Sequence, residues 1–336
     1  MKKIWIRAGV GFLSLALWCL SFFFYKKTEE QAGSFNGYYD MPVLTEAELS
    51  AFLSQAEQPD QLPQITGWSK EDKIPIKGEV REAVSGTLWK IAGSMEMFFA
   101  GQLKEGNYPW EEDEEGCLIS SGLAEKLFGT ERIQGNQVQI FGKTYIVRGC
   151  IKSRDSFAAV FAETEDGLEG ISLQYTDHRQ PGSLAESLLT QVTGSAPDGF
   201  WEGNLYSSLA RVLAALPVWG FVLVCFGRGY RQTNRCAVFA FRLFIKLVAA
   251  AAFCFLFAAG LWMTLRFSGD YLPSMWSDMD FFPRLMQEKQ QVFDEVQKFV
   301  LCPKDANMLE NLRRTAMAAV GSIMAESIFL AEKRKK

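Results

Sequence analysis

The stretch CLISSGLAEKLFG (117–129) decides the fold of the polar part of this chain. Its first four residues, of which the first three are apolar, have the pattern of a short buried strand. Ser120 or Ser121 can cap the helix that follows, and Gly129 is placed to end that helix. The stretch therefore predicts a buried strand that passes directly into a short helix.

A second stretch, QVQIFGKTYIVRG (137–149), predicts a β-hairpin behind that helix. Polar and apolar residues alternate before Gly142 and again after Lys143, as they do on strands with one buried face. The capping box Thr45–Glu48 predicts the start of a further helix. Further strands are expected at 64–68, 80–85, 87–92, 160–162 and 170–175, and a last helix within 181–192.

The chain as a whole has 336 residues, of which 48% are hydrophobic and 22% charged. This composition excludes a disordered or low-complexity protein, because so much apolar surface must be buried. Apolar residues gather in four blocks around a long acidic segment, which is the pattern of a membrane protein with a sizeable soluble part. The blocks lie at 4–25, 212–226, 247–265 and 316–331.

Basic residues in the short segments predict the orientation of these blocks. Residues 2–7 and 228–246 carry Lys and Arg without any acid, and the chain ends in KRKK (333–336). All three clusters lie on one side only if the chain crosses a membrane four times with both termini cytoplasmic. The first block is expected to be an uncleaved anchor, because no small-x-small cleavage site follows it. The last block could instead lie on the membrane surface as an amphipathic helix.

This topology places a multi-pass protein in the plasma membrane and divides the chain into eight segments. In chain order they are an anchor helix (1–25), an extracytoplasmic α+β domain (26–206), a second span (207–227), a basic cytoplasmic loop with the start of the third helix (228–246), a third span (247–265), an extracytoplasmic loop with an amphipathic helix (266–314), a fourth span (315–331) and a cytoplasmic tail (332–336).

The outer segment 26–206 has 15 Lys and Arg against 29 Asp and Glu, a net charge of −14, so nucleic acid would be repelled from it. Its first residues, 26–39, are polar and are expected to form a tether. Residues 39–196 are expected to fold alone as a soluble domain, because the predicted strands and helices carry their own apolar faces.

The two quoted stretches, together with Gly135-Asn136 before the hairpin, resemble the MacB-type periplasmic core domain of FtsX-like ABC transporter permeases. Leu103 to Pro109 resembles that family's Leu, Gly and aromatic before an acidic segment, so the likeness covers about 103–151. The order of one span, an outer domain and three further spans also fits. The resemblance implies an α+β extracytoplasmic domain, MacB periplasmic-core-like, on a four-helix transmembrane α bundle.

The resemblance also implies a function: a permease-like subunit that couples a separate cytoplasmic ABC ATPase to the outer domain, for export or mechanotransmission. It implies a second permease copy or paralogue as a further partner. Arg228, Arg231 and Arg235 of the basic loop would contact the ATPase. This loop lacks the family's Gly-Ile-Arg-Arg-Ala-Leu-Gly-Ala-like stretch. The alternative is therefore a membrane-anchored accessory or binding protein that keeps the outer domain without coupling to an ATPase.

Motifs for catalysis or cofactor binding are not visible, so we expect no enzyme, no cofactor and no metal site in this chain. Gly142-Lys143-Thr144 is not a Walker A motif, because Gln137 stands where the first glycine belongs and a hairpin follows. His178 is the only histidine, which excludes a paired-histidine zinc site. The acidic run 111–115 lacks the spaced ligands of a calcium loop and is expected to be a solvated turn.

Glu326 is the acidic residue inside the fourth apolar block. A carboxylate is costly in lipid, so we expect it to face another helix along a stripe of small residues that includes Ala319 and Ser322. A proton or substrate role is the alternative.

The helix expected within 280–301 is amphipathic. It is expected to pack on the outer domain or the spans, with the outer leaflet or a partner as the alternative. Cys117 and Cys150 lie in predicted strands. They could form a disulfide, although small buried side chains are the favoured interpretation.

Overall fold

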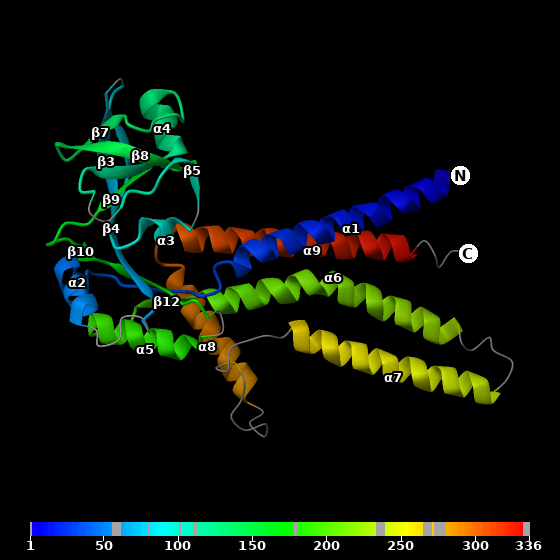
Figure 1. Cartoon of the computed structure of the whole chain (residues 1–336). Helices are drawn as coiled ribbons and strands as arrows, with labels where there is room; N and C mark the ends of the chain where they lie inside the picture. Colours follow the sequence, from blue (N-terminus) through cyan, green and yellow to red (C-terminus); the bar gives the residue numbers. More distant parts are fainter. Residues whose placement is uncertain are drawn as a thin grey trace. The chain divides into compact units, whose positions relative to one another are not determined.

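The computed structural model describes residues 2–55, 62–79, 81–100, 102–110, 113–177, 180–232, 239–264, 271 and 280–331. The chain forms two compact units (Figure 1). Gly33–Glu202 and Gly269–Ala306 make a mixed α/β domain, whereas Met1–Ala32, Gly203–Ser268 and Asn307–Lys336 make a helical unit.

The α/β domain is built on a ten-stranded sheet with the strand order β12-β1-β11-β3-β4-β9-β6-β8-β5, and β7 pairs with β3 and β8. The pairs β4–β9 and β6–β8 are parallel and the other described pairs of this sheet are antiparallel. The strands are β1 (Ser34–Tyr38), β3 (Gln64–Gly78), β4 (Val84–Ala92), β5 (Leu103–Gly106), β6 (Gly116–Ser120), β7 (Gln137–Ile140), β8 (Lys143–Ile151), β9 (Phe157–Phe161), β11 (Gly170–Gln174) and β12 (Gly199–Glu202). A separate pair joins β2 (Leu44–Thr45) to β10 (Gly167–Leu168).

The stretch 117–149 folds as its sequence predicts. β6 is fully buried and passes into α4 (Ser121–Phe128). Ser120, rather than Ser121, is the cap: its hydroxyl accepts a hydrogen bond from the amide of Leu123 at 3.1 Å. Gly129 ends the helix in the left-handed conformation with a φ of 71°. β7 and β8 then form the expected hairpin.

Two apolar clusters hold the domain together. One lies under α4 and gathers side chains from β3, β4, β6, β7, β8 and β9. The other joins α2 (Glu46–Gln55) and α5 (Gly182–Thr193) to β1, β3 and β11. The short helix α3 (Met95–Phe99) adds Met95, Phe98 and Phe99, all nearly or fully buried. The sheet is therefore covered at both ends by helices of the domain itself.

Three expectations about the domain are wrong. The two strands expected at 80–85 and 87–92 are one strand, β4, and Gly86 lies inside it. A glycine fits this position because a Cβ there would come within 2.9 Å of Ile76 and of the Ser156 carbonyl. Val80 lies outside the described residues. Helix α5 is followed by a further strand, β12. The expected tether at 26–39 consists of the last turn of α1 and the buried strand β1.

The helical unit contains α1 (Lys2–Glu29), α6 (Gly203–Gln232), α7 (Phe239–Thr264) and the greater part of α9 (Pro303–Ala331). Among the described residues, two segments are long and apolar enough to cross a membrane, Ala8–Glu29 and Gly203–Gly227. α7 contains a shorter apolar stretch, Ile245–Phe255. The described residues of α9 contain no segment that is long and apolar enough to cross a membrane.

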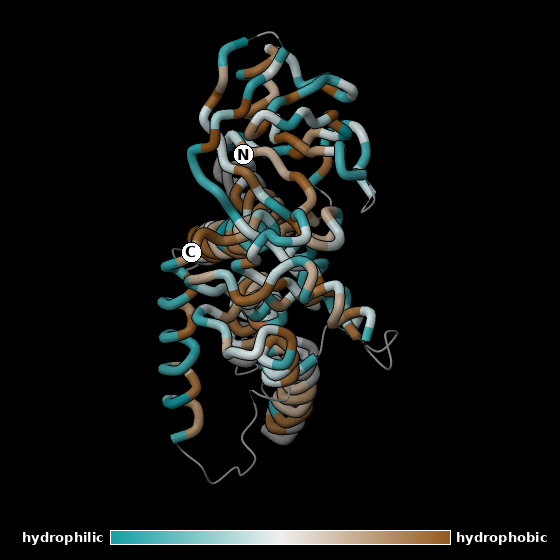
Figure 2. Tube along the Cα trace, turned by 90° about the vertical axis from the view of Figure 1, so that its left-hand side faces the viewer, coloured by the Kyte–Doolittle hydropathy of each residue, from teal (hydrophilic) through white to brown (hydrophobic). Residues whose placement is uncertain are grey.

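Large apolar side chains are exposed on all four of these helices. Phe12 on α1 is 73% exposed, Phe255 on α7 is 74% exposed and Met324 on α9 is 63% exposed. Figure 2 shows the hydropathy of these residues as brown colour along the long helices. Exposed apolar surface of this extent is the surface that a lipid environment would cover.

The last helix begins earlier than the apolar block predicts. α9 starts at Pro303 and includes Arg313 and Arg314, which lie in the expected outer loop, as an unbroken helix. The amphipathic helix expected within 280–301 is α8 (Phe281–Val296), and it belongs to the α/β domain. Its Val292 and Val296 face that domain's interior, while Met286 is 73% exposed.

Candidate coupling site

Strands β1 and β12 connect the sheet directly to two long helices. α1 ends at Glu29 and β1 begins at Ser34, while β12 ends at Glu202 and α6 begins at Gly203. The two strands are antiparallel neighbours, with Phe35 opposite Glu202. The last residue of β12 therefore lies opposite the second residue of β1 on a hydrogen-bonded ladder.

The start of α9 is bound to the same strand β1. Asp305, in the first turn of α9, is fully buried, and both of its carboxylate oxygens accept hydrogen bonds at 2.6 Å from Nδ2 of Asn36. The hydroxyl of Tyr38 donates to the same carboxylate at 2.6 Å and accepts from the amide of Cys302 at 3.1 Å. Next to it, Nζ of Lys304 donates to Oε1 of Gln174 on β11 at 2.5 Å.

The sequence of β1 divides its two faces between these roles. Side chains alternate along a strand, so Asn36 and Tyr38 share one face and Phe35 lies on the other. Phe35 is fully buried in the cluster with α2 and α5. β1 is therefore held by apolar packing on one face and by a carboxylate on the other.

Burial controls the electrostatics of this cluster, which we call the junction cluster (Asn36, Tyr38, Gln174, Cys302, Lys304 and Asp305). Burial raises the pKa of Asp305 to about 6, against the opposing effect of the hydrogen bonds from Tyr38 and Asn36. Burial, together with the neighbouring Asp305, raises the pKa of Tyr38 well above its ordinary value. Burial also lowers the pKa of Lys304. Tyr38 therefore keeps its proton and remains a donor at neutral pH.

A second buried carboxylate lies at the end of β12. Glu202 is 3% exposed and accepts from Nζ of Lys289 on α8 at 2.5 Å. The hydroxyl of Tyr271 also donates to Glu202. These contacts bind α8 to the residue that directly precedes α6. The interaction joins the segment after α7 to the end of the sheet.

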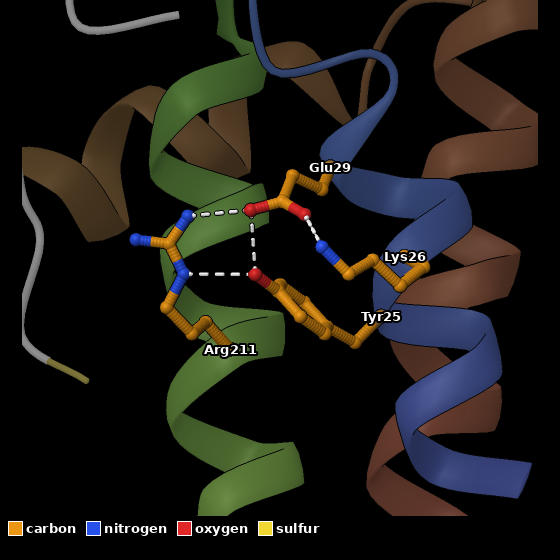
Figure 3. Close-up of polar contacts among 4 residues, drawn as sticks. All are labelled: Tyr25, Lys26, Glu29 and Arg211. Atoms are coloured by element: carbon orange, nitrogen blue, oxygen red, sulfur yellow. Dashed lines mark hydrogen bonds and ion pairs between the residues drawn. The ribbon is translucent and has the colours of Figure 1, made fainter. Parts of the chain in front are cut away.

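In the helical unit, α1 and α6 are joined by a polar cluster near the end of α1 (Figure 3). Arg211 on α6 donates to the hydroxyl of Tyr25 at 3.0 Å and pairs with Glu29 at 2.9 Å. The Tyr25 hydroxyl donates to Glu29 at 2.6 Å, and Lys26 pairs with the same carboxylate at 2.6 Å. The Glu29 carboxylate thus forms ion pairs with two basic side chains, one from each helix.

Glu326 lies where α1, α6 and α9 meet. Its Oε1 accepts from the hydroxyl of Ser14 on α1 at 3.4 Å, and its Oε2 lies 3.9 Å from the position that a Cβ on Gly220 of α6 would take. Ser14 and Ser322 exchange further hydrogen bonds, in which the Ser322 hydroxyl donates to the Ser14 carbonyl at 3.0 Å. Glu326 thus faces two helices of its own chain.

The other residues predicted from the sequence lie apart from these sites. Arg228 and Arg231 belong to the last turns of α6, where the structure describes the backbone and not their side chains, and Arg235 lies outside the described residues. His178 lies outside them as well. Cys117 and Cys150 are buried free thiols, and burial raises the pKa of Cys150 to about 11.

The acidic run 111–115 is described from Asp113 onward. The guanidinium of Arg148 pairs with Asp113 at 2.7 and 3.1 Å. This residue therefore has a structural partner within the domain. Among the described residues, no three His, Cys, Asp or Glu side chains gather as metal ligands would.

The sequence interpretation did not identify the junction cluster. One signal was available, because Cys-Pro-Lys-Asp (302–305) has a proline where it favours a helix start and an acid in the first turn. The partners Asn36 and Tyr38 lie more than 260 positions earlier in the chain. Only the sheet topology brings them to that helix start.

No protein-family model and no curated protein matches the sequence. Among solved structures, the chain is similar to the periplasmic region of MacB from Actinobacillus actinomycetemcomitans. That match has 14% identity and a TM-score of 0.41, and it covers 50% of this chain and 87% of that one.

Two further solved structures are similar. The extracellular domain of the noncanonic ABC-type transporter YknZ from Gram-positive bacteria has 19% identity and a TM-score of 0.38, over 49% of this chain and 96% of that one. A domain of a putative permease protein from Porphyromonas gingivalis has 13% identity and a TM-score of 0.37, over 49% and 85% respectively.

Proposed function

We propose that this chain is a permease-like membrane subunit of an ABC transporter of the MacB and FtsX type. In this role it couples a separate cytoplasmic ATPase to the extracytoplasmic α/β domain, for export or mechanotransmission. The resemblance of residues 103–151 to the core domain of such permeases supports the proposal. The chain itself acts without a catalytic site, and ATP is hydrolysed by the partner.

One structural observation carries the mechanical part of the proposal. α1 leads into β1, α6 follows β12 directly, and β1 and β12 pair with each other. The first turn of α9 is hydrogen-bonded to β1 through Asp305. Three helices are thus attached to one strand pair through short or buried connections. In this proposal a displacement of any of these helices reaches the sheet through its connection to the strand pair.

The proposed topology has four spans with both termini cytoplasmic and the α/β domain outside the plasma membrane. The apolar segments in α1 and α6 supply two of these spans. The basic clusters at both ends of the chain and between α6 and α7 support the other two, α7 and α9, because they then all lie inside. A second copy or a paralogue completes the permease.

The test is capture of the tagged full-length chain from detergent-solubilised membranes of its host. The proposal expects co-purification of a protein that carries Walker A and ABC signature motifs, together with ATP hydrolysis by the complex. Changing Arg228, Arg231 and Arg235 together to Glu should abolish this association, because three reversed charges oppose docking at the inner loop.

A matched control changes three exposed basic residues of the α/β domain, Arg132, Lys152 and Arg154, to Glu. This control should leave the association intact. If the inner-loop variant also retains the ATPase, the basic loop is not the contact. If the wild-type chain captures no such ATPase, the accessory-protein alternative replaces the proposal.

A further inference from the structure

A cavity of about 380 Å³ opens beside Glu326 within the helical unit. This volume falls within the range of about 300 to 1,000 Å³ of small-molecule pockets. The walls come from three helices and include Gly11, Ser14, Trp18, Phe221, Glu326 and Phe329. The indole of Trp18 donates to the carbonyl of Ala214 at 3.1 Å, so one aromatic wall is held in position.

The cavity carries one ionisable group, the carboxylate of Glu326. Within the described part of the chain this carboxylate has one hydrogen-bond donor, the hydroxyl of Ser14 at 3.4 Å, and no cationic side chain pairs with it. An anion in apolar surroundings is costly unless a counter-charge or a proton neutralises it. Glu29 and Glu202 each have a basic partner, and the buried Asp305 accepts hydrogen bonds from two side chains, Asn36 and Tyr38.

The rest of the lining favours an apolar body of limited size. The aromatic rings of Trp18, Phe221 and Phe329 contribute apolar surface, and Ser14 supplies the other polar atom facing the carboxylate. Aromatic rings attract cations over their faces in addition to burying apolar groups. The combination fits a molecule with a single positive charge and an apolar frame.

We propose that this cavity binds a hydrophobic organic cation, with Glu326 as counter-ion and the aromatic rings around its apolar groups. The outer segment 26–206, with its net charge of −14, would attract the same class of molecule towards the protein. This inference goes beyond the proposed function and does not depend on it, because the site lies in α1, α6 and α9 whether or not an ATPase couples to the chain.

The test titrates the purified full-length protein in neutral detergent with tetraphenylphosphonium. Tetraphenylborate is the matched probe, because it carries the same four phenyl groups around a centre of opposite charge. Equilibrium dialysis against empty micelles measures the bound fraction. One tetraphenylphosphonium per chain is expected, with an affinity at least about tenfold higher than that of tetraphenylborate, because only the cation gains a charge-assisted contact with Glu326.

Two variants test the site. Glu326→Gln should weaken tetraphenylphosphonium binding at least about tenfold. Glu310→Gln removes the same charge from α9 at a residue outside the cavity, and it should leave binding unchanged. Gly11→Leu keeps Glu326 but fills the cavity, because a Cβ at Gly11 has room at 3.6 Å from the Phe329 ring and the longer side chain then extends inward. This variant should also weaken binding.

Several outcomes would overturn the proposal. Equal binding of the two probes would show partition without charge recognition. Unchanged binding in Glu326→Gln would show that Glu326 is not the counter-ion. If that variant does not fold, unchanged binding in Gly11→Leu would show that the cation does not occupy the cavity. A dimer by light scattering that binds no tetraphenylphosphonium would assign the cavity to a helix of a second copy.

Discussion

Asp305 and Asn36 are joined across 269 positions by two contacts of 2.6 Å, from one amide nitrogen to both oxygens of one carboxylate. The first belongs to the opening turn of α9 and the second to the middle of β1. Tyr38, two residues along the same strand, adds a third hydrogen bond to that carboxylate. The start of the last helix is therefore fixed on the strand that follows the first helix.

Asp305→Ala should lower the free energy of unfolding by roughly 3 kcal/mol, because it leaves the Asn36 amide and the Tyr38 hydroxyl buried without an acceptor. Asp305→Asn keeps the shape and one acceptor oxygen and should lower it by less. Chemical denaturation of the full chain in detergent, followed by circular dichroism, measures both. Asp294→Ala, at an exposed acid on α8, is the control and should change stability by less than about 0.5 kcal/mol. Equal effects at the two positions would contradict this prediction.

Because the Asp305 carboxylate is buried, we expect the free energy of unfolding to depend on pH. The pKa of Asp305 is raised from 3.8 to about 6 in the folded chain by burial. A raised carboxylate pKa means that the folded state binds the proton more tightly. The contribution of this group is therefore complete below pH 4 and is lost as pH rises through 6. The loss amounts to roughly 3 kcal/mol.

Asp305→Asn isolates this contribution from those of other carboxylates, which titrate in both proteins. The free energy of unfolding of the wild type, relative to that of the variant, should fall as the pH rises from 4 to 7. A difference that stays constant over this interval would show that Asp305 titrates in its ordinary range.

Ser120→Ala should destabilise the α/β domain by roughly 2 kcal/mol, since its fully buried hydroxyl accepts from the amides of both Leu123 and Phe157 at 3.1 Å. Ser121→Ala removes one hydrogen bond, to the Ser153 carbonyl at 2.8 Å, and should have the smaller effect. Thermal unfolding of the two variants side by side gives the comparison. The reverse order would assign the cap to Ser121.

Local patterns predicted the centre of the domain because neighbouring residues determine it. The strand β6, helix α4 and hairpin β7–β8 follow from alternation, a capping serine and glycines at the turns, and the structure confirms them. The capping box is also present, with the amide of Thr45 donating to Glu48 at 2.7 Å and the amide of Glu48 donating to Thr45 at 3.3 Å. Each of these features spans few residues.

Features that depend on distant pairing could not be predicted in this way. The segment 26–39 is polar in sequence, yet Asn36 is fully buried because Asp305 accepts its hydrogen bonds. β12 is four residues long and carries no alternating signal, and it forms only as the neighbour of β1. A carboxylate is costly in lipid, so the sequence alone predicts that Glu326 contacts another helix. Its hydrogen-bond donor, Ser14, could be identified only from the arrangement of the helices.

The polar cluster between α1 and α6 predicts a specific rescue. Glu29→Arg places a second cation beside Arg211 and should destabilise the helical unit, while the double variant Glu29→Arg with Arg211→Glu restores an opposite-charge pair. The coupling free energy between the two positions should be roughly 1 kcal/mol. The free energies of unfolding of the four proteins of this double-mutant cycle, measured in detergent, give this coupling free energy. Additive single effects would show that the pair does not hold the helices together.

Fragments of the outer segment should differ sharply in stability, contrary to the expectation that residues 39–196 fold alone. That fragment lacks β1 and β12, although β1 lies between β12 and β11 and carries Phe35 and Tyr38, which are almost fully buried. The loss of one buried aromatic side chain already destabilises a domain by about 3 to 5 kcal/mol. Residues 33–202 retain both strands but lack residues 269–306 of the domain, including Asp305. They should therefore unfold cooperatively in urea, with near-ultraviolet dichroism in the folded state, at a lower urea concentration than the domain in the full chain. Residues 39–196 should show neither property. If both fragments unfold at the same urea concentration, the β1–β12 pair is dispensable and cannot be the element that transmits helix movement to the sheet.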